Sequence, residues 1–252
     1  MGCETSRPSR SRRQGGIRNL TISAPQNIPT SIPRTRVDEN GRPVQAVTRT
    51  VSREVLLAAL NHVSAYISER GQHVSFITTG GAVSTLYLQS RPTTHDVDVF
   101  GSDFDNNARN IVNDAMEDAQ VHIPALGTDW LNTSVQIWIP EPFHTELTVA
   151  ARQQNVKVFD GPGLTIYAAP WEFAFSSKIC RLLKGADEFR SYDLADAVSF
   201  IHEFILNHGN EPVAVDTALG WARHYTYRTN PHVLLTLVNE EYRRRYDMDA
   251  FV

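Results

Sequence analysis

The sequence predicts an α/β (α+β) fold, in which a mixed sheet is followed by a C-terminal helical bundle. Three observations support this prediction. Short β-rich runs alternate with helical segments up to about residue 170, and beyond it the apolar positions recur at helical spacing. The first 45 residues show no sustained periodicity. We therefore divide the chain into a basic tail (1–45), an α/β domain (46–170) and a helical domain (171–252).

The expected elements follow from periodicity and from helix-capping residues. A helix should begin after Ser52 and end at Gly71. Strands are expected at 73–79, 95–100, 134–140, 156–160 and 164–169, with helices at 82–90 and 103–119 between them. The C-terminal helices are expected at 170–185, 192–209, 212–226 and 231–246.

The composition is that of a globular protein, with 41% apolar and 21% charged residues. The net charge of −4 is unevenly distributed. Residues 1–50 carry nine arginines against three acids, a net charge of +6, whereas the rest carry 15 basic against 25 acidic residues, a net charge of −10. An acidic folded part does not favour binding along nucleic acid, so no extended DNA track is expected.

Cysteine usage and hydropathy predict a cytoplasmic protein. Cys3 lies in the tail and Cys180 in an expected helix, so a structural disulfide is not expected. No apolar run approaches the roughly 18 residues that span a membrane, and the N-terminus lacks the apolar region of a secretory signal.

The extreme N-terminus carries a pattern typical of lipoproteins. Gly2 followed by Ser6 fits N-myristoylation, and Cys3 would accept a palmitoyl chain. The arginines that follow add a second membrane signal, so peripheral membrane contact through the tail is expected. The alternative is a disordered Arg/Ser tail that begins Met-Gly by chance. Up to residue 45 the composition indicates a disordered or loosely attached arm.

The stretch FITTGGAVSTLYLQSRPTTHDVDVF, residues 76–100, carries the candidate chemistry. Asp96 and Asp98 lie two apart on an expected strand, so both point to one face while Val97 and Val99 point into the core. Two adjacent carboxylates repel each other unless a cation lies between them, and carboxylate oxygens suit Mg²⁺, or Mn²⁺ in its place.

A glycine turn precedes this pair. Gly80 and Gly81 at a strand-to-helix turn allow a phosphate to approach the backbone closely, and the helix N-terminus offers free N–H groups. Ser84 and Thr85 in the first turn of that helix are candidate hydroxyl ligands.

This arrangement resembles the DNA polymerase β-type nucleotidyltransferase superfamily, in which a Gly-Gly turn and a helix precede Asp-x-Asp on the next strand. It is most similar to the AbiEii-type, toxin-like branch, whose pattern continues as Arg-x-Thr-x-Asp-hydrophobic-Asp. Arg91, Thr93 or Thr94, Asp96 and Asp98 match that pattern. The branch also carries a helical lysine, an arginine and an Asp-x-x-Asp helix, which Lys178, Arg181, Arg190, Asp193 and Asp196 match.

The resemblance implies a nucleotidyltransferase-like mixed sheet and a Mg²⁺-dependent enzyme that moves a nucleoside monophosphate (NMP) from a nucleoside triphosphate (NTP) to a hydroxyl. The acceptor would be an RNA end, a protein or a small molecule. It assigns the metal to Asp96 and Asp98, and catalytic roles to these two with Lys178 and Asp193. It assigns nucleotide binding to Gly80, Gly81, Ser84, Thr85, Arg91, Lys178 and Arg181.

One expected part has no clear match in the sequence. Many members carry a third carboxylate on a later strand, where this chain has Gln136. Asp129, Glu141 and Glu146 are weak substitutes, which leaves open a degenerate binding or scaffolding module, or a nucleotide sensor without turnover. A solvated Asp-x-Asp strand edge is the structural alternative. We interpret His95 as structural, pointing with Val97, and the aromatic set Trp171, Phe173 and Phe175 as core.

Overall fold

The computed structural model describes residues 30–102, 104–184, 190–226 and 230–252. The N-terminal half contains β1 (Val51–Ser52), α1 (Arg53–Ser68), β2 (Val74–Thr78), α2 (Gly81–Leu86), β3 (Thr93–Thr94), β4 (Val97–Phe100), α3 (Asn106–His122), β5 (Leu131–Asn132), the 3₁₀ helix η1 (Ser134–Trp138), α4 (Glu141–Gln154), β6 (Lys157–Asp160) and β7 (Leu164–Ala168). The C-terminal half contains α5 (Trp171–Lys184), α6 (Asp193–Asn207), α7 (Val215–Thr226), the π-helix η2 (Val233–Val238) and α8 (Asn239–Tyr246).

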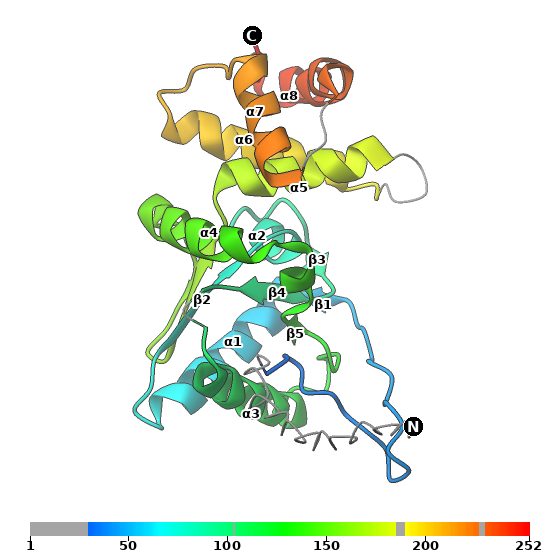
Figure 1. The fold of residues 1–252 in the computed structure, drawn as a ribbon, viewed down its shortest axis with the longest axis vertical. Helices are drawn as coiled ribbons and strands as arrows, with labels where there is room; N and C mark the ends of the chain where they lie inside the picture. Colours follow the sequence, from blue (N-terminus) through cyan, green and yellow to red (C-terminus); the bar gives the residue numbers. More distant parts are fainter. Residues whose placement is uncertain (1–29, 103, 185–189, 227–229) are drawn as a thin grey trace, which may run out of the picture.

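The main sheet is mixed, as the sequence predicts. Its strand order is β5-β4-β2-β7-β6, with β2 and β7 parallel, β4 and β5 parallel, and the other pairs antiparallel. A separate antiparallel pair joins β1 to β3, with Val51 opposite Thr94. The helices α5 to α8 lie together at one end of the molecule, beyond the sheet (Figure 1). A mixed α/β sheet followed by helices is therefore confirmed.

Helices cover both faces of this sheet. Val97 and Val99 of β4 pack with residues of α1 and α3, whereas Phe100 packs with Leu147 and Ala151 of α4 on the opposite face. Since side chains alternate along a strand, Asp98 shares the α4 face with Phe100. The helix α1 begins as expected, with Ser52 accepting a hydrogen bond from the Val55 amide.

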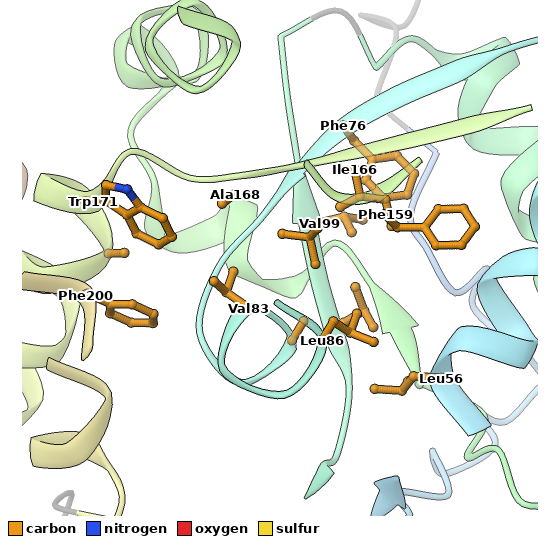
Figure 2. Packing of buried hydrophobic residues seen from close by; sticks show 14 of the residues in the cluster. Leu56, Phe76, Val83, Leu86, Val99, Phe159, Ile166, Ala168, Trp171 and Phe200 are labelled. Carbon is orange, nitrogen blue, oxygen red and sulfur yellow. The ribbon is translucent and has the colours of Figure 1, made fainter. Parts of the chain in front are cut away.

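A continuous apolar core joins the two halves. Phe76, Val99 and Ile166 of the sheet belong to the same buried cluster as Trp171 and Phe200 of the helical half (Figure 2). Trp171 stacks on Phe200 with ring centroids 6.1 Å apart. The expectation that Trp171, Phe173 and Phe175 are core residues is confirmed, because each is at most 7% exposed. The two halves therefore form one packed unit.

Two expectations about elements are wrong. Residues 134–140 were expected to form a strand, but Ser134–Trp138 form a 3₁₀ helix that leaves Ile137 82% and Trp138 83% exposed. The cause is local: the side chain of Asn132 accepts a hydrogen bond from the Ser134 amide, which turns the chain there. The helix α4 was not expected at all.

The chain is attached earlier than its composition suggests. The amide of Ile32 donates to the Thr133 hydroxyl, the Thr133 amide donates to the Ile32 carbonyl, and Ile32 is 2% exposed. Arg34 pairs with Asp114 of α3. The arm from residue 30 onward is therefore not loosely attached; Gly2 and Cys3 lie outside the described residues. Within the described ranges, every helix is too short or too polar to cross a membrane.

Candidate active site

The site begins at the glycine turn between β2 and α2. Gly80 has a φ of +68°, a conformation that side chains disfavour. A Cβ on Gly81 would lie 2.3 Å from the Thr94 hydroxyl oxygen, so only glycine fits at this position. The hydroxyl of Thr78, at the end of β2, donates to the carbonyl of Asp98 at 2.8 Å. The turn and the acidic strand β4 are thus held together.

Asp96 and Asp98 form a partly buried acidic pair at the start of β4. Burial and then the charge of Asp129 raise the pKa of Asp96. Burial and then the charge of Asp96 raise the pKa of Asp98 to about 6. The charged state of the pair is therefore costly in the protein alone, and a nearby cation would stabilise it.

The neighbouring strand β5 places an amide beside the acidic pair. Asn132 of β5 stands beside Asp98 in the parallel register and donates to Asp96 Oδ2 at 3.4 Å. Gln136 donates nothing to this pair; its side chain accepts from Arg109.

Asp129, one of the weak candidates for the third carboxylate, does line the same cleft. Its Oδ2 accepts from the Thr48 hydroxyl at 2.8 Å, and its buried Oδ1 has no hydrogen-bond partner. Glu146 does not line the cleft and pairs with His224 at 2.8 Å, while the side chain of Glu141 lies outside the described structure.

A buried ion cluster forms the other wall. Lys178 of α5 is 3% exposed, and its ammonium lies 2.9 Å from Asp193 Oδ1 and 2.7 Å from Asp196 Oδ2 on α6. Arg181 Nη1 lies 3.6 Å from Asp193, and Arg91 Nη1 lies 3.4 Å from Asp196. Since Asp193 and Asp196 are fully buried and do not line the cleft, they position the cations rather than face a ligand.

Tyr192 connects the cations to one another. The Arg91 guanidinium lies 3.7 Å from its ring centroid, and the Lys178 ammonium 5.5 Å. Arg190 donates to the Tyr192 hydroxyl at 2.9 Å. Stacking on an aromatic face holds guanidinium groups in place without neutralising them. Tyr192 therefore fixes the cationic wall.

Acidic and cationic groups meet in a single cleft of about 1220 Å³. The glycine turn, the acids Asp96, Asp98 and Asp129, and the cations Arg91, Lys178, Arg181 and Arg190 all line it. Its apolar rim includes Trp138, Ile139, Phe173 and Tyr225. Because residues from both halves line it, the cleft lies where the sheet meets the helical bundle (Figure 1).

Three predicted residues lie elsewhere than expected. Ser84 and Thr85 are fully buried and do not line the cleft. The Ser84 hydroxyl donates to Asp196 at 2.8 Å, because the short helix α2 turns this side toward α6. His95 is exposed and lines the cleft, which contradicts the expectation that it points into the core with Val97. It lies two residues before Val97, the first residue of β4, and is therefore not bound by the strand alternation.

Sequence reasoning missed several cleft residues. Tyr192 and Thr48, which line the cleft, and Asn132, which donates to Asp96, carry no motif of their own and reach the site through the long-range fold. The position of Tyr192 directly before the Asp-x-x-Asp helix is the one local signal that could have found it. Trp138 was not identified as a cleft residue because a strand was expected at 134–140, where the structure has a 3₁₀ helix.

Comparison with known proteins identifies a family without an assigned activity. No curated protein and no solved structure matches this chain. A family model matches residues 49–249, which runs from the start of β1 through α8 and includes both walls of the cleft. The chain therefore belongs to the family described as a domain of unknown function, DUF7582.

Proposed function

We propose that the cleft binds a nucleoside triphosphate with Mg²⁺ and transfers its nucleoside monophosphate to a hydroxyl acceptor. The observation that carries this proposal is that the partly buried acids Asp96 and Asp98 line the same cleft as the cations Lys178, Arg181 and Arg190, together with the glycine turn. A metal–triphosphate complex has the complementary distribution of charge: the cation meets the acids and the phosphates meet the cationic wall.

The residues present fit a divalent cation in part. Asp96 and Asp98 offer oxygen ligands whose charged form burial disfavours even with Arg181 and Arg190 nearby, so they would hold Mg²⁺ or Mn²⁺. The ligand atoms of Asp96, Asp98 and Asp129 do not already converge on one point, in contrast to a group found elsewhere among the described residues. The bound ion would neutralise charge developing on the phosphate during in-line displacement.

Each remaining role belongs to a side chain of the cleft. Lys178, Arg181 and Arg190 bind the phosphates, and Arg91 is held by Tyr192 beside the glycine turn. The hydroxyl oxygen of the acceptor attacks the α-phosphorus, and the bond to the pyrophosphate oxygen breaks. Asp129, whose Oδ1 has no hydrogen-bond partner among the described residues, accepts the proton of the attacking hydroxyl.

The nucleobase has an exposed aromatic surface available to it. Trp138 is 83% exposed and lies at the apolar rim of the cleft. An indole that is unpacked in the free protein can stack on a base with little reorganisation. Trp138 is therefore the proposed base platform, and the acceptor would approach from the Asp129 side.

A labelled-transfer assay tests this function. Purified full-length protein is incubated with Mg²⁺ and each α-labelled NTP in turn, with total RNA, total protein or small hydroxyl compounds as acceptors. Label should move with the wild type and be lost with Asp96→Asn/Asp98→Asn, while Glu211→Gln, an exposed acid outside the cleft, should retain transfer. Transfer that survives the double variant would refute the assignment.

A second function, a degenerate binding module, rests on one observation. The residue beside Asp98 on β5 is the amide Asn132 rather than an acid, and Lys178 is already paired with two carboxylates. Calorimetry with NTP and Mg²⁺ separates the candidates. An enzyme or a sensor binds NTP in a Mg²⁺-dependent way, whereas a scaffold that has lost its site does not.

A further inference from the structure

A second polar cluster lies away from the cleft, between α1 and α3. These helices pack side by side on the face of the sheet opposite α4 (Figure 1). His62 of α1 and Asp118 and His122 of α3 present ligand atoms that all lie within 4.8 Å of one another. None of the three lines the cleft. Among the described residues, this is the group of three whose donors already converge.

The contacts within the cluster fix its geometry. His62 Nε2 lies 2.5 Å from Asp118 Oδ2, and His122 Nδ1 lies 3.6 Å from the same oxygen. Asp118 and His122 are four residues apart, so one face of α3 presents both. The imidazole rings lie 4.9 Å apart at their centroids. Two nitrogens and one oxygen thus surround one small volume from two helices.

The helices around the cluster hold its ligands in place. His122 Nδ1 lies 2.9 Å from the carbonyl oxygen of Asp118; a metal bound at Nε2 would leave this orienting backbone contact in place, whereas one bound at Nδ1 would replace it. The Asp118 carboxylate is directed toward α1 by its contact with His62 Nε2. Arg70 donates to the Tyr66 carbonyl and lies over the Tyr66 ring.

We propose that His62, Asp118 and His122 form a zinc site that links α1 to α3. Imidazole nitrogens with one carboxylate suit Zn²⁺, whereas Mg²⁺ prefers oxygen ligands, so this site and the cleft select different metals. Three protein ligands leave the fourth tetrahedral position to water, and the side-chain exposures of 29%, 40% and 59% for His62, Asp118 and His122 leave room for it.

The consequence is a structural or regulatory role rather than a catalytic one. Neither the cleft nor the smaller cavity lined by His73 and Asp105 is lined by His62, Asp118 or His122. The ion would replace the proton shared by His62 and Asp118 and join two helices that both pack on the central sheet. Zinc binding should therefore stabilise the fold that carries the cleft.

Calorimetry with zinc alone tests the proposal. Full-length protein freed of metal by chelation should bind one Zn²⁺ per chain at this site. At a free concentration of about 100 times Kd, the midpoint of thermal unfolding should rise by about 5–10 °C. Co²⁺ in place of Zn²⁺ should give the visible absorption of a four-coordinate ion with nitrogen and oxygen ligands.

Matched variants locate the binding. His62→Gln, His122→Gln and Asp118→Asn should each weaken zinc binding at least about tenfold. His73→Gln, which removes a histidine bonded to Pro162 and Thr165 elsewhere, should leave it unchanged, as should Asp96→Asn/Asp98→Asn in the cleft. Far-UV circular dichroism checks that each variant is folded. If a histidine variant unfolds, the test rests on Asp118→Asn, which keeps the shape of the side chain. The proposal would be overturned if the wild type did not bind zinc at one site, or if all three variants bound zinc as tightly as the wild type.

Discussion

Replacing Lys178 by methionine should cost the protein a large part of its stability. The Lys178 side chain is 4% exposed, and its ammonium lies 2.9 Å from Asp193 and 2.7 Å from Asp196, both of which are buried. Methionine fills a similar volume but leaves two carboxylates without their shared cation. Removing one partner of a buried ion pair costs about 3–5 kcal/mol. The expected loss in the free energy of unfolding is of that size, with a drop in Tm of about 10 °C.

Urea unfolding followed by tryptophan fluorescence measures this loss, since Trp130 and Trp171 are buried. The matched control is Arg181→Met on the same helix, whose side chain is 43% exposed and 3.6 Å from Asp193; it should cost less than about 1 kcal/mol. The triple variant Lys178→Met/Asp193→Asn/Asp196→Asn should recover part of the loss, because the buried charges are gone. A loss below about 1 kcal/mol for Lys178→Met, or an equal loss for Arg181→Met, would refute the reasoning.

Three further outcomes are expected. Gly81→Ala should destabilise the protein by about 1–3 kcal/mol in thermal unfolding, because its Cβ would lie 2.3 Å from the Thr94 hydroxyl; Thr94→Ala in the same chain should restore most of it. Because the pKa of Asp98 is raised to about 6 from 3.8, its stabilising contribution is full below pH 3.8 and is lost as the pH rises through 6. When the pH is lowered from 7 to 5 without Mg²⁺, the free energy of unfolding measured by urea titration should therefore rise by about 1 kcal/mol more for the wild type than for Asp98→Asn. An equal rise in the two proteins would contradict the raised pKa of Asp98. Trp138→Ala should weaken NTP binding in calorimetry by roughly tenfold or more with unchanged Tm, since the indole is 83% exposed; unchanged affinity would exclude base stacking there.

The sequence predicts the local parts of the site well. A glycine pair after an apolar run and two aspartates on one strand face are short-range patterns, and the structure brings both to one cleft. The helical periodicity after residue 170 is likewise local, and α5 and α6 lie where it predicts. Lys178 lines the same cleft, as the resemblance to nucleotidyltransferases implies, although that function stays a proposal.

The parts that the sequence does not predict have one local and one long-range cause. The apolar alternation of Val135, Ile137 and Ile139 favours a strand, but the hydrogen bond from the Ser134 amide to the side chain of Asn132, two residues earlier, turns the chain and leaves Ile137 exposed. Ser84 follows a glycine turn as a phosphate ligand would, yet its hydroxyl donates to Asp196, 112 residues away. That second partner cannot be found from spacing along the chain.

The early attachment of the chain has a consequence for truncated forms of the protein. β5 is an edge strand of the main sheet, and the segment around Ile32 hydrogen-bonds to Thr133 directly after it. A protein cut at residue 46, where composition suggests the tail ends, would lose this cover and expose unpaired backbone beside Asn132. Open strand edges pair with other chains. Such a truncated protein should self-associate on size-exclusion chromatography, whereas one beginning at residue 30 should not.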